Sequence, residues 1–388
     1  MNRSSGILMP ISSLPSPYGI GTFGKAAYDF ADFLHAAGQG YWQLLPLGPT
    51  SYGDSPYQSF SSFAGNPYFI DLDLLVKDKL LTRAEVNACD WGDDPRYVDY
   101  GKIYASRFTL LEKAKARGFT RDREAVAAFE RENERWLPNY ALFMALKRHF
   151  GMKSWTEWDD EDIRCRTSGE VIERYRAELR EDVELFTYSQ FLFFRQWEAL
   201  KAYIHSLGIR IIGDLPIYVA MDSADVWAEP EMFQLDEHNV PTEVSGVPPD
   251  CFSEDGQLWG NPLYDWDAME KDGLNDGQKQ IKEAFEAYGV KDYVVVQKGD
   301  TRIAVVGVFG KDALECAPTC ELLFKDPVEA VKQTVAEIKK NENVDMIACV
   351  SHGGTWEDED KSEDEILAKK VPDLDLIISG HSHTELNE

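Results

Sequence analysis

The sequence lacks long apolar runs, and cysteine is scarce for its length. A membrane-spanning helix needs about 20 consecutive apolar residues, and no run in the 388 residues approaches that length. The 6 cysteines are scattered and do not form the pattern of a disulfide framework. The first ten residues carry one positive charge and no sustained apolar stretch, so we expect no secretory signal. We therefore expect a cytoplasmic protein without a membrane partner.

Positive charge is also scarce. Lys and Arg number 40 against 68 Asp and Glu, which gives a formal net charge of -28. Because a nucleic-acid-binding surface needs a basic face, we expect no nucleic acid among the partners. The 44% hydrophobic and 12% aromatic content excludes a disordered chain, and the length suffices for two or three domains. The oligomeric state cannot be read from the sequence.

The composition changes after Gly273. The first 273 residues hold 17 Arg and 10 Lys, whereas the last 115 hold 1 Arg and 12 Lys. Trp divides 9 to 1 across the same point, and Pro divides 15 to 3. A Lys-rich accessory domain would give this pattern, and so would two unrelated coding segments that meet near residues 272–275. We favour the second interpretation and expect two domains, 1–273 and 274–388.

The first part alternates predicted strands and helices. Residues 41–47 and 209–215 are short apolar runs ended by Gly, Pro or Asp, which is typical of buried parallel strands. Between them, residues 99–207 are mostly helical in pattern. The fold class of this part is therefore α/β.

The second part repeats the alternation. Residues 302–308, 345–350 and 374–379 are predicted strands, and 327–338 is the predicted amphipathic helix between the first two. This part is also α/β.

Three clusters of polar and aromatic residues follow strands in the first part. They are residues 51–58, 213–220 and 246–264. Ligands bind outside the carboxyl ends of parallel strands, and carboxylates and amides beside flat aromatic rings suit a sugar. Each cluster alone is explained by turn chemistry, but their joint occurrence favours a carbohydrate site.

Longer motifs connect these clusters to a known family. The motifs are residues 6–21, Leu45-Pro-Leu-Gly-Pro-Thr-Ser-Tyr-Gly-Asp-Ser-Pro-Tyr-Gln58, Gly213-Asp-Leu-Pro216, Asp222-Ser-Ala-Asp-Val-Trp227, Gly246-Val-Pro-Pro-Asp250 and Trp259-Gly-Asn-Pro-Leu-Tyr264. On these motifs, residues 6–273 closely resemble the amylomaltase (disproportionating enzyme) family of 4-α-glucanotransferases. The resemblance implies a (β/α)8 TIM barrel, here partial, with a helical insertion around residues 99–200.

The same resemblance implies a function. The family transfers α-1,4-glucan segments between glucan chains by a retaining mechanism and without a cofactor. The partner would therefore be an α-1,4-glucan or a maltooligosaccharide. By resemblance, the substrate-binding residues would be Tyr57, Asp214, Trp259, Gln257 and Asn261.

The carboxylates that transfer requires are missing from the expected place. Retaining transfer uses a carboxylate nucleophile and a carboxylic acid about 5–5.5 Å apart. In the family, the nucleophile lies in an Arg-x-Asp-His-Phe-Arg strand end shortly after the position of Asp267, and no such motif follows Asp267 here. Asp214 is a sugar ligand in the family. We therefore expect a 4-α-glucanotransferase by family that has no catalytic residues and is inactive; a non-catalytic glucan-binding remnant is an alternative.

Two histidine motifs follow strands in the second part, Val350-Ser-His-Gly-Gly354 and Ile378-Ser-Gly-His-Ser-His-Thr384. On these motifs, residues 274–388 resemble part of the α/β sandwich of a calcineurin-like metallophosphoesterase of the 5′-nucleotidase type. The resemblance implies a divalent metal (Zn, Mn or Fe). Its ligands would be His352, His381 and His383. The family's other ligand motifs are absent, so two-metal hydrolysis should fail; a phosphohydrolase activity of this part is the second alternative.

Overall fold

The chain divides into two compact units. The computed structural model describes residues 4–94, 96–247, 253, 255–273, 293–311, 313, 325–356, 358 and 361–380. The first unit comprises residues 1–245 and 259–273, and the second comprises residues 246–258 and 274–388. We describe each unit by itself. No helix within these described ranges combines the length and the apolar composition needed to cross a bilayer.

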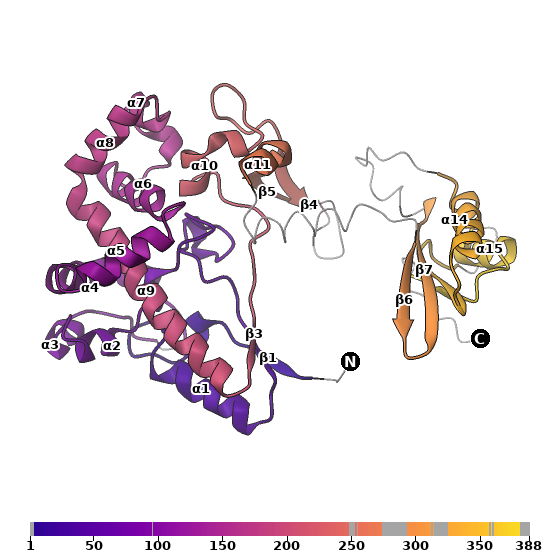
Figure 1. The fold of residues 1–388 in the computed structure, drawn as a ribbon, viewed down its shortest axis with the longest axis horizontal. Helices are drawn as coiled ribbons and strands as arrows, with labels where there is room; N and C mark the ends of the chain where they lie inside the picture. The colour runs from indigo at the N-terminus through magenta and orange to yellow at the C-terminus, as the bar shows by residue number, and fades with distance from the viewer. Residues whose placement is uncertain are drawn as a thin grey trace. The chain divides into compact units, whose positions relative to one another are not determined.

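The elements up to Gly273 include five strands and a series of helices (Figure 1). The strands are β1 (Gly6–Leu8), β2 (Tyr41–Gln43), β3 (Arg210–Ile212), β4 (Val244–Val247) and β5 (Gln257–Pro262). The α-helices are α1 (Lys25–Ala36), α2 (Leu72–Lys77), α3 (Arg83–Asn87), α4 (Tyr100–Gly118), α5 (Arg123–Glu132), α6 (Leu137–His149), α7 (Glu161–Arg164), α8 (Gly169–Glu178), α9 (Arg180–Ser206), α10 (Ala224–Ala228) and α11 (Trp266–Asp272).

Strands β1, β2 and β3 form a parallel sheet with β2 in the middle. The row Ile7, Trp42 and Ile211 is paired across the three strands and belongs to the main hydrophobic core, together with residues of α1 and α9. In the next row, Leu8 is 50% exposed and Ile212 is 44% exposed. Since successive side chains of a strand point to opposite faces, one face of this sheet is packed and the other is open.

The predicted strands are present but shorter than expected. β2 ends at Gln43, three residues before Pro46, and β3 ends at Ile212, although 41–47 and 209–215 were the predicted ranges. The expected barrel is not closed in the described part of the chain, where the parallel sheet has three strands. The first unit is therefore a mixed α/β fold.

The helical pattern predicted for residues 99–207 is confirmed by α4 to α9. Helix α9 runs for 27 residues and buries an apolar face that includes Leu192, Leu200 and Ile204. It ends before Gly208, whose φ of 77° is a left-handed conformation that favours glycine. The chain then enters β3 directly, so this helix places β3 beside β2.

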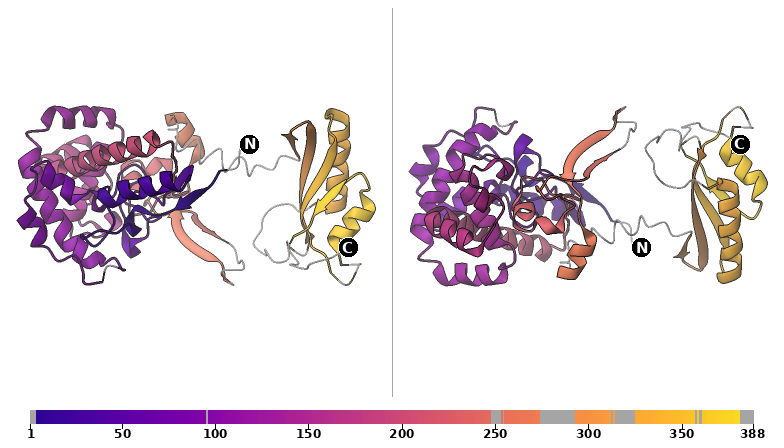
Figure 2. Two further views of the ribbon diagram at one scale, coloured as in Figure 1. Left: turned by 90° about the horizontal axis from the view of Figure 1, so that it is seen from below. Right: turned by 90° about the horizontal axis from the view of Figure 1, so that it is seen from above.

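The second unit contains one four-stranded sheet and two long helices in its described residues. The elements are β6 (Val294–Lys298), β7 (Thr301–Phe309), β8 (Met346–His352), β9 (Leu376–Ile378), α14 (Pro327–Asn341) and α15 (Glu363–Lys370). The strand order is β6-β7-β8-β9, with β6 antiparallel to β7 and the others parallel. Both helices lie on the same face of the sheet (Figures 1 and 2).

The sequence predicted β7, β8, β9 and α14 but not β6. The missed signal is the Gly299-Asp300 pair, a two-residue hairpin connection in which Gly299 has a φ of 63°. The core of this unit is small and includes Val306, Val335 and Ile338. The second sheet of the expected sandwich is not found among the residues that the structure describes.

Candidate functional site

Two of the polar clusters meet at Tyr57 and Asp214. The loop that carries Tyr57 is closed on itself by hydrogen bonds, including one from Ser51 N to Gln58 O of 2.9 Å. Asp214 follows β3 by two residues. The Tyr57 hydroxyl donates to the Asp214 carboxylate at 2.8 Å, across 157 residues of sequence. This hydrogen bond raises the pKa of Tyr57, so the phenol stays protonated and continues to donate.

The second and third clusters meet at a group of aromatic rings. Trp259 on β5 is 42% exposed, and its ring centroid lies 6.4 Å from that of Tyr218 at an interplanar angle of 58°. Tyr218 also stacks on Tyr264, with centroids 6.1 Å apart and an angle of 20°. Burial raises the pKa of both tyrosines. Trp259 is thus an exposed ring that packs against Tyr218, which in turn stacks on Tyr264.

Asn261 lies inside the protein. Its side chain is 5% exposed, and Nδ2 donates to the backbone oxygen of Val219 at 2.8 Å. Its Oδ1 accepts longer hydrogen bonds from Gln58 Nε2 at 3.4 Å and from Ser245 Oγ at 3.5 Å. Gln257, the remaining predicted residue, is the exposed first residue of β5. The structure therefore connects all three predicted clusters, and Asn261 contacts each of them from within.

Buried charges that the sequence analysis did not select hold the loop after β3. Lys147 of α6 is 1% exposed, and its Nζ donates to Asp222 at 2.5 Å and to the backbone oxygen of Lys153 at 2.7 Å. Asp225 accepts from the backbone N and the hydroxyl of Ser62 at 3.1 and 2.9 Å. The available signal was a lysine at the end of the apolar run Tyr140-Ala-Leu-Phe-Met-Ala-Leu146. Because a buried charge needs a partner, the Lys147–Asp222 pair helps to set where the loop lies, and the half-buried Asp225 adds hydrogen bonds to Ser62.

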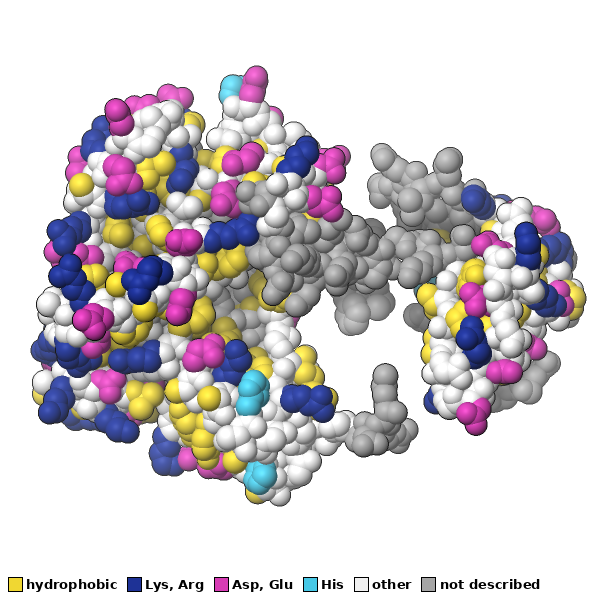
Figure 3. All heavy atoms as spheres, viewed as in Figure 1, with side chains coloured by type: hydrophobic (Ala, Val, Ile, Leu, Met, Phe, Trp, Pro, Cys, Tyr) yellow, Lys and Arg dark blue, Asp and Glu magenta, His cyan; other side chains and the backbone are white. Residues whose placement is uncertain are grey.

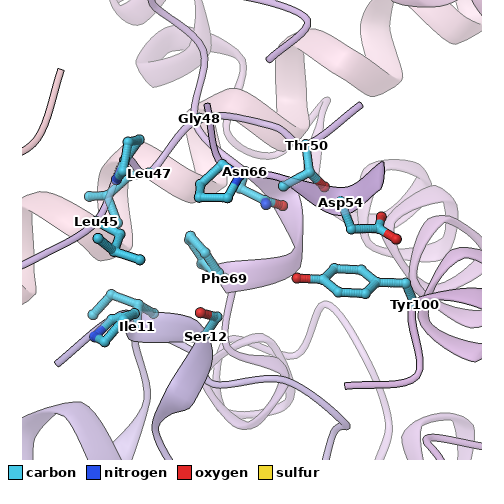
Figure 4. Close-up of a pocket in the computed structure, with 13 residues that line it drawn as sticks. Ile11, Ser12, Leu45, Leu47, Gly48, Thr50, Asp54, Asn66, Phe69 and Tyr100 are labelled. Atoms are coloured by element: carbon cyan, nitrogen blue, oxygen red, sulfur yellow. The ribbon is translucent and has the colours of Figure 1, made fainter. Parts of the chain in front are cut away.

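A pocket opens beside the first cluster (Figure 4). Its polar groups include the side chains of Ser12, Thr50, Asp54 and Tyr100, and Figure 4 shows the hydroxyl of Tyr100 pointing toward its interior. The remaining labelled residues are Ile11, Leu45, Leu47, Gly48, Asn66 and Phe69. The lining contains none of the five predicted substrate-binding residues, so sequence reasoning did not find this pocket.

Charge on the visible face of the first unit is mixed. Figure 3 shows basic and acidic side chains interspersed over its helices. Exposed ion pairs of the first unit include Lys25 with Asp29 and Arg176 with Glu173. This face therefore has no field of one sign that would steer a charged polymer.

In the second unit, one of the three predicted metal ligands is described. His352 is the last residue of β8, and its ring stacks on Phe309 with centroids 5.7 Å apart and an angle of 14°. His381 and His383 lie outside the described residues. Within the described ranges, no group of three or more His, Cys, Asp or Glu side chains could hold a metal ion. A single described histidine does not make a ligand set, so the described residues do not by themselves form a metal site.

Beside His352, a buried carboxylate connects the ends of β8 and β9. Asp364 of α15 accepts hydrogen bonds from the hydroxyls of Ser351 and Ser379 and from Gly354 N. All of its described donors are neutral. This arrangement holds two strand ends together.

Comparison with known proteins identifies the first part of the chain. A profile of glycoside hydrolase family 77, described as 4-alpha-glucanotransferase, matches residues 9–291. The chain belongs to this family. The 4-alpha-glucanotransferases of Streptococcus pneumoniae (serotype 4) and Thermus thermophilus are each 50% identical to it, over 289 and 290 residues. Each alignment covers 74% of this chain and 57% of the relative, so the chain spans little more than half the length of these relatives.

Solved structures of the 4-alpha-glucanotransferase family agree. The amylomaltase from Streptococcus agalactiae in complex with acarbose is 37% identical, with a TM-score of 0.69, and the match covers 95% of this chain and 72% of that one. The amylomaltase from Corynebacterium glutamicum, at 16% identity and a TM-score of 0.53, shows the likeness of fold alone. The family profile extends beyond Gly273, where the composition changes, into residues 274–291, which lie outside the described ranges.

Proposed function

We propose that the first unit binds α-1,4-glucan segments, and that this chain binds them without transferring them. The observation that carries the proposal is the meeting of Tyr57 with Asp214 across two loops at 2.8 Å. A phenol, a carboxylate and an exposed indole offer hydrogen bonds to sugar hydroxyls and a flat apolar surface to sugar C–H groups. The related protein whose structure contains acarbose supports an oligosaccharide as the ligand class.

Within this proposal, Tyr57, Asp214 and Trp259, which all belong to the first unit, touch the glucan. Gln257 and Trp259 are two residues apart on β5, so their side chains point to the same face of that strand. Asn261 lies at the buried end of the strand, beyond Gly260, whose φ of 76° interrupts the regular alternation of side chains. Binding of this kind uses no cofactor.

The proposal that transfer does not occur rests on the sequence after Asp267. Residues 268–388 contain no Arg-x-Asp-His motif, and the one arginine among them, Arg302, lies within β7. The boundary that we propose, 1–273 and 274–388, is supported by the change in composition and by the grouping of residues 274–388 in the second compact unit. Two unrelated segments joined near this point would account for both observations.

Glucan binding and transfer are tested on the full chain. Maltoheptaose should quench tryptophan fluorescence in a saturable manner, and Trp259→Ala should weaken binding at least about tenfold, which corresponds to about 1.4 kcal/mol. Trp356→Phe, in the second part of the chain, is the matched control and should bind normally. If the wild-type chain released glucose from maltotriose and Asp214→Asn abolished that release, the proposal that the chain binds glucan without transferring it would be wrong. Absence of binding by the wild type would overturn the proposal as a whole.

For the second part, we propose that residues 274–388 derive from a metallophosphoesterase-like domain and bind a single divalent ion through His352, His381 and His383. The supporting observation is the pairing of β8 with β9, in which Val350 lies opposite Ile378. His352 follows the first of these by two residues, and His381 follows the second by three. Dialysis against Zn²⁺ should leave about one ion per chain, and His352→Ala should lose it. Hydrolysis of nitrophenyl phosphate by the loaded protein would contradict the proposed lack of phosphatase activity.

A further inference from the structure

We infer that Asn261 is a positioning residue: it sets the distance between the Tyr57 loop and the aromatic surface at Trp259 and does not itself touch the glucan. This inference rests on the proposed glucan binding and changes the role that the family resemblance implied for Asn261. It concerns how the site is held together.

The first ground is burial. Asn261 is 5% exposed, whereas Trp259, two residues earlier in β5, is 42% exposed. The strand thus runs from an exposed end, which carries the ring, to a buried end, which carries the amide. A ligand that stacks on Trp259 reaches a surface from which the Asn261 amide is withdrawn.

The second ground is that the amide of Asn261 already forms hydrogen bonds within the protein. Nδ2 donates to Val219 O at 2.8 Å, and Oδ1 accepts from Gln58 and Ser245. Both polar atoms of the side chain therefore have protein partners. A glucan hydroxyl would have to compete for them, and breaking the bond to Val219 would leave a buried carbonyl without a donor.

The third ground is the topology of the contacts, which form a closed ring. Tyr57 bonds to Asp214, the chain runs from Asp214 to Val219, Val219 bonds to Asn261, and Asn261 bonds to Gln58, which is adjacent to Tyr57. Such a ring limits how far the Tyr57 loop can move from the backbone at Val219 while its hydrogen bonds are kept.

The closed ring of contacts is connected to the aromatic surface because Tyr218 and Val219 are neighbours in the sequence. Tyr218, whose ring packs against Trp259, directly precedes Val219. Asn261 therefore fixes the backbone beside Tyr218 and, through β5, the position of Trp259. Loss of the Asn261 amide should loosen the Tyr218–Trp259 pair even when no sugar is present.

The test compares Asn261→Ala with Gln196→Ala in the full chain. Gln196 is a matched control because it is also a buried amide that bonds to a backbone segment, through Asp71 N at 2.7 Å and Asp71 O at 3.2 Å. Both variants should lose thermal stability, but only Asn261→Ala should weaken maltoheptaose binding, by about tenfold. Each variant is also made in a Trp259→Ala background. Subtracting the fluorescence of the double variant from that of the single variant gives the contribution of Trp259.

In ligand-free protein, Asn261→Ala should make Trp259 more accessible to acrylamide, and Gln196→Ala should not. A weaker affinity with an unchanged ligand-free Trp259 would show that Asn261 contacts the glucan directly and would overturn the positioning role. Wild-type affinity in Asn261→Ala would overturn it as well. If the wild type does not bind maltoheptaose, the proposed function fails, while the ligand-free quenching still tests the inference by itself.

Discussion

Both units pack one face of their parallel strands and leave apolar side chains exposed on the other, but they join their strand ends with different chemistry. In the first unit, exposed Leu8 and Ile212 mark the open face; in the second, Val350 and Ile378 do. The loops of the first unit are joined by a neutral amide that both donates and accepts. The strand ends of the second are joined by Asp364, a carboxylate that accepts from hydroxyls.

This difference bears on the neutral ligand that we propose for the first unit. The amide of Asn261 leaves Tyr57, Asp214 and Trp259 at the surface, and all three suit a sugar. In the second unit, Asp364 holds the ends of β8 and β9 together, and His352 lies beside Phe309. Similar parallel strands thus carry different surroundings at their carboxyl ends.

The largest effect is expected at the buried ion pair of the first unit. Lys147→Met should cost about 3–5 kcal/mol, because it leaves Asp222 without its cation in a largely buried position. Urea unfolding followed by tryptophan fluorescence reports on this unit, since 9 of the 10 tryptophans precede Gly273. Lys339→Met, which removes an exposed pair with Asp373 in the second unit, is the control and should cost less than about 1 kcal/mol. Equal costs would show that the buried pair contributes no more than a surface one.

A smaller effect is expected at the carboxylate of the second unit. Asp364→Ala should cost about 1–3 kcal/mol, because Gly354 N loses its acceptor and two hydroxyls lose theirs. The measurement is hydrogen exchange of peptides that cover β8 and β9, which should exchange faster. Peptides from α9 in the first unit serve as the internal reference, and acceleration there would contradict a change confined to the second unit.

The smallest effect is a pH dependence of the first unit. Arg121 lowers the pKa of the Asp122 carboxyl, and the carboxylate also accepts from Tyr188. A carboxyl whose pKa is lower in the folded state stabilises the protein above its unfolded pKa of about 3.9, and this contribution is lost as the pH falls through and below that value. Asp122→Asn should therefore lower the urea midpoint at pH 7 and reduce its fall between pH 5 and pH 3. An unchanged acid slope would show that the ion pair does not contribute.

Local patterns in the sequence were sufficient for much of the fold. The apolar spacing of α9 and α14 predicted both helices, and the short apolar runs predicted β7, β8 and β9. The lengths of β2 and β3 were overestimated, because an apolar run does not show where backbone pairing with a neighbour stops. Strand β6 was missed, since its hairpin turn lies between residues with no clear alternation.

Some residues of the candidate site were predicted from the sequence, and others were not. Tyr57, Asp214 and Trp259 were selected from motifs, and the structure places them in two connected groups. Lys147 and Asp225 were not selected as site residues. Lys147 lies in an apolar helix and Asp225 in a short helix, and the local sequence does not show that either side chain has a partner far away in the chain. Asn261 was selected as a glucan ligand from its motif, and only its burial suggests another role.

By itself, the sequence determined the family, the α/β alternation and the order of the motifs, because these depend on residue identity and local spacing. Only the tertiary structure decided that the hydroxyl of Tyr57 meets a carboxylate 157 residues away and that one buried amide links three clusters. Such contacts depend on how helices and loops pack. A buried polar group takes the partner that packing brings to it, since burial without a partner is costly.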